Sequence, residues 1–395
     1  MPKDSPFFLT RVECPICKTI NEFETIKMGA YVEEDRDTDF CPIEIKWRFP
    51  RYQGSHPLTY FTVTCSNCFY TREFNNNYKE WKNDSHFRTY KLKTIKAKHL
   101  DQLAIADSVL KQMGTIVDII KYPNESAIVK LHLAIFDELL ADHPSMLDLG
   151  RYYIRVGWMF RYLDGETVSD SQNNFLNGLL VELENKFGSL WQHQNSSSDY
   201  TKAILNQVNS QLEHESLSVE TKSEMLPFKE NFENIISGIE DKFESCSNEI
   251  NKLSELMNEY KSTLLGTDST GGTSFGTYSS LSHFLSEMKK SWPEIVINEN
   301  EALRKAIHYY IQALEDGRTI GKGNQQIQAS FLIAELSRRV GDFDNAKQYF
   351  NSTIKYGQEF VYQNRQNPSR TALARKILEL AIEQGKINLE ASKKV

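Results

Sequence analysis

Two Cys-x-x-Cys pairs, set far apart near the N-terminus, constrain the fold of this chain more than any other feature. Cys14 and Cys17 form the first pair, and Cys65 and Cys68 form the second. Two residues between cysteines let both thiolates face one metal ion from a tight turn, and two such turns supply four tetrahedral ligands. A closed site leaves no position for water or substrate. We therefore expect one structural Zn²⁺ per chain, bound by Cys14, Cys17, Cys65 and Cys68.

The long gap between the pairs leaves the ligand set open. Between Cys17 and Cys65 there are 47 residues, whereas zinc ribbons usually have about 15 to 20 residues between their pairs. Cys41 and His56 lie in this gap, and either could replace one of the four ligands. A redox-active dithiol is an alternative use of the pairs, and Cys41 is otherwise an ordinary buried thiol.

Several features favour a reducing compartment, in which such pairs bind metal rather than form disulfides. The apolar run Phe7-Phe8-Leu9 is too short for a secretory signal, and no stretch reaches the roughly 18 apolar residues of a membrane span. We therefore expect a cytoplasmic protein. The net charge of -7 also argues against nucleic-acid or anionic-membrane binding over the whole surface.

An acidic segment, Asp35-Arg36-Asp37-Thr38-Asp39-Phe40-Cys41-Pro42, lies between the two pairs. Its three alternating carboxylates resemble a hard-cation site, but Ca²⁺ loops need more oxygen ligands and a glycine at the sharp turn. We favour an acidic turn in which Arg36 is paired and Asp37 or Asp39 accepts hydrogen bonds from nearby backbone N–H groups. The alternative is that this segment is a recognition surface.

Basic and aromatic residues alternate over residues 69–98. Eight lysines and arginines stand against three acidic residues, and seven aromatic residues are interleaved with them. This combination is used for binding single-stranded nucleic acid, in which bases stack on aromatic rings. The favoured interpretation is a solvated basic face over a small aromatic core, with nucleic-acid binding as the alternative.

From about residue 91 onward, few Gly or Pro residues occur and apolar residues recur at steps of three and four, which predicts helices. A sharper pattern begins at Gly341-Asp342, where Ala346 and Phe350 follow at the spacing of a tetratricopeptide repeat's second helix. Ala334 occupies the matching small position in the preceding helix. Residues 294–395 are therefore expected to form tetratricopeptide-like helices.

The sequence pattern predicts a second copy of this repeat that is split along the chain. A helix over 146–163 resembles a first repeat helix, and Ala302, Ala306, Tyr310 and Ala313 mark a second one. We expect residues 166–293 to be a helical insertion, with a heptad segment over 225–264 and a flexible linker over 266–280. The heptad seam, which includes Cys246, pairs either with a helix at 200–217 or with another copy of the chain as a coiled coil.

Together these residues resemble a bacterial family known as domain of unknown function 2225. The likeness rests on Cys14-Pro15-Ile16-Cys17, on Arg36-Asp37-Thr38-Asp39-Phe40-Cys41, on Cys65-Ser66-Asn67-Cys68-Phe69-Tyr70, on Gly157-Trp158 and on the helices of 299–350. The resemblance implies this order of domains and a bacterial cytoplasmic setting, without an assigned activity. The chain departs from the family at Thr71 and in the large insertion.

The expected fold is mainly α, with a small β-rich, zinc-ribbon-like module over 1–90 and a helical region over 91–165 before the insertion. The leading functional interpretation is a non-enzymatic scaffold that binds a protein partner in a groove of the helical repeats. Four residues of the first repeat helices are candidates for that groove: Tyr153, Arg161, Arg338 and Arg339. A nucleic-acid-associated zinc protein and a cysteine-based redox protein are the alternatives.

Overall fold

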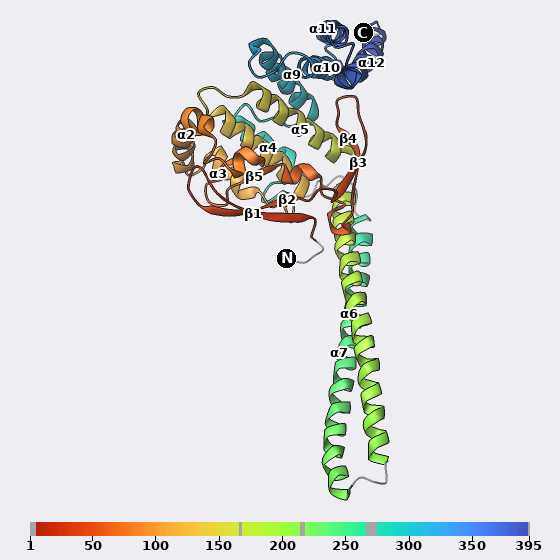
Figure 1. Cartoon of the computed structure of the whole chain (residues 1–395). Helices are drawn as coiled ribbons and strands as arrows, with labels where there is room; N and C mark the ends of the chain where they lie inside the picture. Colours follow the sequence, from red (N-terminus) through yellow and green to blue (C-terminus); the bar gives the residue numbers. More distant parts are fainter. Residues whose placement is uncertain (1–4, 166–167, 214–217, 266–274, 394–395) are drawn as a thin grey trace. The chain divides into compact units, whose positions relative to one another are not determined.

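The computed structural model describes residues 5–165, 168–213, 218–265 and 275–393. The chain is mainly helical, with short antiparallel strand pairs near the N-terminus (Figure 1). It divides into two compact units. The first comprises Met1–Phe49, Ser55–Val168 and Gly272–Val395, and the second comprises Pro50–Gly54 and Ser169–Gly271.

Six strands form three separate two-stranded antiparallel ribbons. They are β1 (Phe7–Glu13) with β2 (Ile20–Ile26), β3 (Tyr31–Arg36) with β4 (Pro42–Trp47), and β5 (Thr62–Thr64) with β6 (Thr71–Glu73). An isolated two-stranded ribbon is marginally stable in water. Each ribbon therefore depends on other contacts, and two of them, β1–β2 and β5–β6, are joined through the cysteine pairs.

Short helices connect these ribbons to a helical layer. In chain order they are η1 (Pro50–Tyr52), η2 (Pro57–Tyr60), α1 (Asn76–Lys79), the π-helical turn η3 (Phe87–Lys91), α2 (Leu92–Ala104) and α3 (Val109–Ile116). Next comes α4 (Pro123–Leu139), which begins with a proline at its first turn, where the missing N–H costs nothing. Its residues from Ala127 to Glu138 are buried on every side, so α4 is the centre of the first unit.

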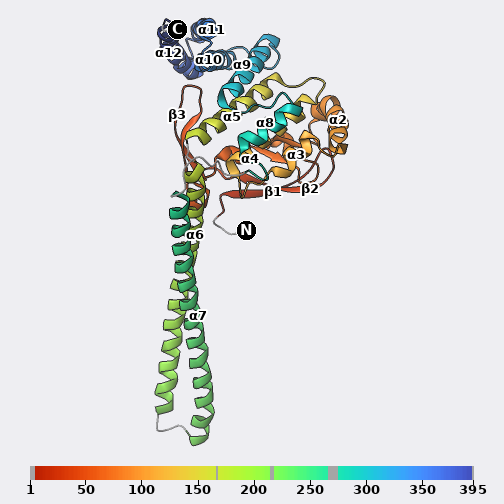
Figure 2. The ribbon, with the colours of Figure 1, turned by 180° about the vertical axis from the view of Figure 1, so that it is seen from behind.

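Six further helices complete the first unit. They are α5 (Met146–Gly165), α8 (Leu281–Ser291), α9 (Glu299–Asp316), α10 (Asn324–Arg339), α11 (Phe343–Gln363) and, at the C-terminus, α12 (Pro368–Ala391). Helices α9 to α12 pack each against the next, and α5 packs along α9 although 133 residues separate them (Figure 1). Seen from behind, α8 lies beside α4 (Figure 2).

The expected helix pair around Gly341 is present. Gly341 adopts a left-handed conformation (φ 78°), and Asp342 caps α11 by accepting a hydrogen bond from the N–H of Asn345. Ala334, Ala346 and Phe350 are all fully buried between α10, α11 and α12. Small residues at these positions let the helices approach closely.

Close approach also explains how α5 pairs with α9. A Cβ atom at Gly157 would lie 2.9 Å from Leu303 Cδ2, and one at Gly150 would lie 3.1 Å from the Tyr310 ring. Ala302 and Tyr310, both expected in a repeat helix, are buried at this contact. The chain segments that the sequence pattern assigned to one split repeat are therefore neighbours in space.

The second unit is built on two long helices, α6 (Val168–Glu213) and α7 (Val219–Leu265), which run side by side (Figures 1 and 2). The Phe243 ring lies 6.3 Å from Phe187 and 5.9 Å from Trp191, and Ser198 donates a hydrogen bond to Glu240. The expected seam is thus used within the chain, and Cys246 on it is exposed. The side chains of Met257, Tyr260 and Leu264 and residues 214–217 lie outside the described residues.

The segment 266–280, expected to be a flexible linker, is described only from Phe275. There Phe275 pairs with Tyr278 through two backbone hydrogen bonds and is fully buried beside Tyr122 and Phe284. Phe275 is therefore part of the core of the first unit, whereas Gly276, Thr277 and Ser279 are exposed. Among the helices that the structure describes, none combines the length and the apolar character needed to cross a bilayer.

Candidate metal centre

The two cysteine pairs sit on turns of the same backbone geometry. In the first turn, Cys14 N–H donates to Thr19 O (2.9 Å) and Lys18 N–H donates to Cys14 O (3.1 Å). In the second, Cys65 N–H donates to Tyr70 O and Phe69 N–H to Cys65 O, both at 2.9 Å.

The residue four positions after each first cysteine has a positive φ, 67° at Lys18 and 65° at Phe69. Non-glycine residues rarely adopt this conformation. Its presence at matching positions of both turns shows that each turn is held in shape by its surroundings.

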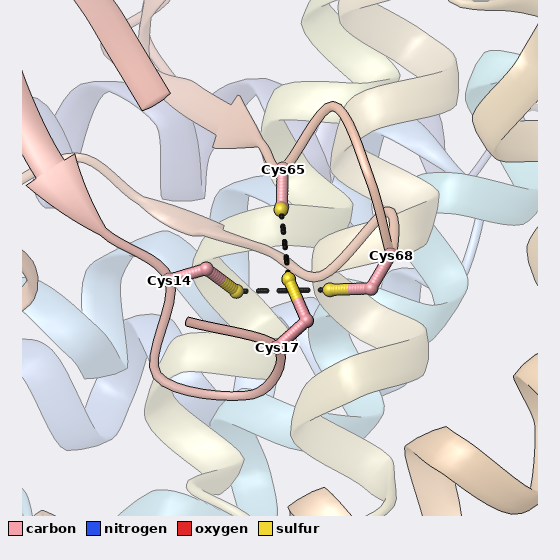
Figure 3. A group of neighbouring side chains, drawn as sticks. All are labelled: Cys14, Cys17, Cys65 and Cys68. Carbon is pink, nitrogen blue, oxygen red and sulfur yellow. Dashed lines mark hydrogen bonds between the residues drawn. The ribbon is translucent and has the colours of Figure 1, made fainter. Parts of the chain in front are cut away.

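The four thiols converge on one point (Figure 3). Their sulfur atoms all lie within 4.8 Å of one another, with Cys14 and Cys68 at 3.6 Å and Cys17 and Cys65 at 3.5 Å. Cys14, Cys65 and Cys68 are fully buried, and Cys17 is partly exposed. Four sulfur atoms at such separations fit the ligand set of a tetrahedral site. The cluster can hold a metal ion.

Hydrogen bonds among the thiols strongly perturb their acidity. A hydrogen bond with Cys65 raises the pKa of Cys14 to about 12, and a hydrogen bond with Cys14 also raises the pKa of Cys68. The same contacts lower the pKa of Cys65. The shared hydrogen bonds thus favour protonated thiols at Cys14 and Cys68 beside a thiolate at Cys65. A divalent cation would compensate four thiolates, which is the chemistry such a donor set suits.

Polar neighbours position two of the sulfur atoms. Asn21 Nδ2 donates to Cys65 Sγ at 3.5 Å, while its Oδ1 accepts from the N–H of Ser66 at 2.9 Å. Asn21 lies on β2 and is buried. Thr19 Oγ1 lies 3.3 Å from Cys17 Sγ. The two Asn21 contacts connect the first ribbon with the second cysteine turn.

A buried His99–Asp137 pair supports the second cysteine turn from behind. His99, on α2, places Nε2 2.8 Å from Cys68 O and Nδ1 2.6 Å from Asp137 Oδ1. The other oxygen of Asp137 accepts the N–H of Thr71 at 2.7 Å. Both side chains are almost completely buried. The pair therefore fixes the backbone on both sides of the Cys68 turn to α2 and α4.

The protonation state of the His99–Asp137 pair follows from the groups that each side chain contacts. Burial alone lowers the pKa of His99, but the Asp137 carboxylate beside it raises that pKa overall. Burial raises the pKa of Asp137, while His99 lowers it. Because Cys68 O and Asp137 Oδ1 both need a donor, we place protons on both nitrogens of His99.

Sequence reasoning missed His99 and Asp137. Neither belongs to a motif, and they lie 38 positions apart in the chain. Their only sequence signal is polar character at buried helix positions, which becomes visible once the helices are placed.

The two alternative ligands, Cys41 and His56, are not in the cluster. His56 is buried, caps η2 by accepting the N–H of Leu58 at Nδ1, and donates its own backbone N–H to Asn124. Burial lowers the pKa of its ring to about 3. Cys41 is buried at the β3–β4 turn, and burial followed by the Asp39 charge raises its pKa to about 12. The interpretation of Cys41 as an ordinary buried thiol agrees with this environment.

The acidic segment forms the tip of the β3–β4 ribbon, and its internal contacts are those expected. Arg36 pairs with Glu33 at 2.5 Å. Asp37 Oδ1 accepts the N–H of Thr38 at 2.7 Å, and Asp39 Oδ1 accepts the N–H of Cys41 at 3.2 Å.

The same tip also binds two helices far along the chain. Arg161 on α5 contacts Asp39 at 2.7 Å and Asp37 at 3.1 Å, and Arg339 on α10 contacts Asp37 at 2.6 Å. Trp158 Nε1 donates to the buried carboxylate of Asp39 at 3.2 Å. The acidic turn is therefore a docking element that joins the N-terminal ribbons to the helical layer.

This docking changes the interpretation of the groove candidates. Arg161 and Arg339 bind the tip, Arg338 pairs with the buried Glu335 at 2.6 Å, and Tyr153 is fully buried. These four side chains are used inside the protein and do not form an open surface for a partner.

The basic aromatic stretch over 69–98 has its rings turned inward. Tyr70, Tyr78, Trp81 and Phe87 are buried, and among its seven aromatic residues Tyr90 alone is exposed, at 68%. Several cations are paired, including Lys82 with Glu13 and Lys91 with Glu138. Stacking of nucleobases needs exposed rings. The favoured interpretation, a basic face over an aromatic core, describes this stretch.

Comparison with known proteins gives one match. A family described as "Uncharacterized protein conserved in bacteria (DUF2225)" matches residues 7–224 and 228–375. No curated protein and no solved structure shows significant similarity to the chain.

Proposed function

The chain belongs to the bacterial DUF2225 family, and from its closed cluster of four thiols we propose that it is a non-enzymatic scaffold held together by one structural Zn²⁺. The observation that carries this proposal is the convergence of Cys14, Cys17, Cys65 and Cys68 within 4.8 Å of one another. Four protein ligands complete a tetrahedral zinc site, which leaves no open position for catalysis.

The place of the cluster supports a structural role. It joins the β1–β2 and β5–β6 ribbons, whose small core packs against α2 and the end of α4. Because the unfolded chain lacks a preformed site, the binding energy of the metal adds to the stability of the fold. The zinc-binding module proposed over residues 1–90 would thus be a rigid base for the helices.

Metal content and thiol reactivity test the zinc proposal directly. We expect elemental analysis of the purified full-length protein to give one zinc per chain, and a chelator to release four thiols together. Cys41, which is buried, and Cys246, which is exposed, give the comparison within the same chain. A chain without metal, or one that readily forms a Cys14–Cys68 or Cys17–Cys65 disulfide, would favour redox chemistry instead.

The scaffold role is supported by the outer face of α12. Its inner face, with Ala374, Ile377 and Ala381, is fully buried against α10 and α11. On the remaining surface of the helix, four apolar residues are 41% to 45% exposed, namely Leu373, Ile382, Ile387 and Leu389. Ile382 and Leu389 are seven residues, about two turns, apart and therefore lie on the same side of α12, whereas Leu373 and Ile387 lie on the other side. Exposed apolar residues on one side of a helix suit a partner that presents an apolar helix face. We propose that the partner surface is the side of α12 that carries Ile382 and Leu389.

Paired variants test this assignment. Proteins that co-purify with the wild-type chain would be compared quantitatively with those of an Ile382→Glu/Leu389→Glu variant. Ile43→Glu is the control, because Ile43 on β4 is 67% exposed and lies outside these helices. We expect a partner to be retained by the control and lost by the double variant. Identical recovery from all three chains contradicts a binding surface on α12.

A further inference from the structure

A cavity of about 300 Å³ lies between the tip of the β3–β4 ribbon and helices α5, α9 and α10. Its walls include Arg151, Arg155 and Trp158 of α5, Tyr310 of α9, and Gln328 and Leu332 of α10. This volume is at the lower end of the range for small-molecule sites. Polar side chains of α5, α9 and α10 line it together with apolar ones.

The central observation is a cation without a counter-ion. The Arg155 guanidinium donates from Nη1 to Arg151 O at 2.8 Å and stacks on the Phe61 ring, 4.3 Å from its centroid. Among the described residues no carboxylate forms an ion pair with Arg155, and its Nε is buried without an acceptor. Burial, followed by the charge of Arg151, lowers the pKa of Arg155.

A charge removed from water normally has a partner. Arg155 therefore lines the cavity as a guanidinium with unused hydrogen-bonding capacity, since a guanidinium carries five N–H donors.

The other charges around the cavity are already paired. Asp39 accepts from Trp158 and Arg161, and Arg151 pairs with Glu73 at 3.1 Å and with Asp148 at 3.1 Å. The uncompensated charge of the cavity is thus the positive charge of Arg155. This charge selects an anion rather than a cation or a neutral ligand.

Two neutral polar groups and an apolar wall complete the site. Tyr310 and Gln328 line the cavity, and the hydroxyl of Tyr310 and the side-chain amide of Gln328 have no hydrogen-bond partner among the residues that the structure describes. Burial raises the pKa of Tyr310 to about 12, so its hydroxyl remains a donor at neutral pH. Ile154, Ala329 and Leu332 supply the apolar side.

We propose that this cavity binds a small organic carboxylate, with the carboxylate at Arg155 and an apolar or aromatic body between Trp158 and Leu332. Guanidinium and carboxylate form charge-assisted hydrogen bonds, which are stronger than neutral ones. The Tyr310 hydroxyl and the Gln328 amide donate the further hydrogen bonds that a carboxylate accepts. This site is separate from the thiol cluster and from the outer face of α12, so it stands whether or not the scaffold proposal holds.

The test compares acids with their neutral amides on the full-length, zinc-loaded protein. Phenylacetate, indole-3-acetate and acetate would be titrated at millimolar concentration against phenylacetamide, indole-3-acetamide and acetamide. Calorimetry gives the affinity, and thermal unfolding gives a second readout. We expect phenylacetate or indole-3-acetate to bind at least about tenfold more tightly than its amide, because the amide leaves Arg155 unpaired. Acetate should bind more weakly because it lacks the apolar body.

Two variants assign the binding to the cavity. Arg155→Met should abolish the preference for the acid over the amide, and Arg155→Lys should weaken it while keeping a positive charge. Arg88→Met is the control, since Arg88 is exposed in the N-terminal module. Zinc content and the thermal transition of each variant, measured without ligand, show that the variant is folded.

Three results would overturn the proposal. The first is the absence of any preference for an acid over its amide in the wild-type protein. The second is an undiminished preference in a folded Arg155→Met variant. The third is stabilisation by inorganic phosphate equal to that by the aromatic acids, which would show that the apolar walls play no part.

Discussion

Cys68 is held from both sides, because its sulfur belongs to the thiol cluster and its carbonyl oxygen accepts a hydrogen bond from His99 Nε2. We predict that Cys68→Ser removes the bound zinc and destabilises the first unit by about 4–5 kcal/mol or more, as expected when a structural metal is lost. Elemental analysis and urea unfolding check both effects. Cys246→Ser is the control, since Cys246 is an exposed thiol on α7. Equal zinc content in the two variants would contradict the four-thiol site.

His99 should matter almost as much as a ligand. We predict that His99→Ala costs about 3–5 kcal/mol, because it leaves the Asp137 carboxylate buried without its partner. It should also weaken zinc binding by about 10- to 100-fold, as other outer contacts of metal ligands do. Competition with a coloured chelator measures the affinity. His86→Ala, which removes an exposed histidine near the start of η3, should leave zinc affinity unchanged.

For individual residues, the sequence predicts only those site residues that belong to a local sequence pattern. Cys14, Cys17, Cys65 and Cys68 could be selected because two residues between cysteines form a metal-binding turn, whatever the 47 residues between the pairs do. His99 could not be selected, since its role depends on α2 and α4 bringing it to Cys68 O and Asp137. The excluded alternatives, Cys41 and His56, carry no sequence mark that separates them from ligands.

At the scale of secondary-structure elements, the docking of the β3–β4 ribbon onto the helices depends on one buried carboxylate, that of Asp39. Asp39 accepts from Arg161, Trp158 and the N–H of Cys41 and is fully buried. We predict that Asp39→Asn costs about 3–5 kcal/mol, because it leaves Arg161 with less compensating charge. Chemical denaturation measures this loss.

Asp35→Asn is the matched control for Asp39→Asn. Asp35 is exposed and has a φ of 54°, a conformation that asparagine adopts readily. A small effect, within about 0.5 kcal/mol, is expected there. Equal destabilisation by both substitutions would show that the docked tip contributes little.

Helix α3 packs so closely on the second cysteine turn that only glycine fits at residue 114. A Cβ atom there would lie 2.1 Å from Phe69 Cγ. We predict that Gly114→Ala costs more than about 3 kcal/mol and lowers zinc affinity, because Phe69 must move and it follows Cys68 directly. Gly188→Ala on α6, where nothing lies within 4 Å, should instead stabilise its helix by up to about 1 kcal/mol. Helix unfolding followed by circular dichroism distinguishes the two.

Periodicity predicted the helices but not the docking of the ribbon. The turn at Gly341-Asp342 and the small residues Ala334 and Ala346 identify a close helix pair because both features act locally. The contact of Asp37 with Arg339 joins residues 302 positions apart. The pattern of charges in the sequence could not identify Arg339 as the partner of Asp37, because Arg36 and Arg161 are equally plausible partners for an acidic turn.

At the scale of the whole molecule, the division into two compact units leads to a deletion experiment. We predict that replacing residues 169–271 with a short Gly/Ser linker leaves one zinc per chain and a cooperative thermal transition, since the metal centre and the core around α4 lie in the first unit. The removed helices should remain helical as a separate fragment. A deleted chain that loses zinc or unfolds without cooperativity would show that the first unit needs the second.

The sequence indicated this overall plan through composition, since long stretches without Gly or Pro and the heptad seam separate the second unit from the rest. It did not indicate that Phe275, just after a run rich in Gly, Ser and Thr, returns to the core beside Tyr122. Phe275 is a single buried aromatic residue at this point of the chain. One residue produces no periodic pattern from which its burial could be predicted.

The docking of the β3–β4 tip on Arg339 also sets an order of events during protein synthesis. Translation at about 5–20 residues per second adds the 302 residues between Asp37 and Arg339 over roughly 15–60 s. Throughout that interval the acidic tip leaves the ribosome without the arginine of α10 that it finally binds. The four cysteines can come together early, whereas the contact of the tip with α10 can form only after Arg339 has been added to the chain.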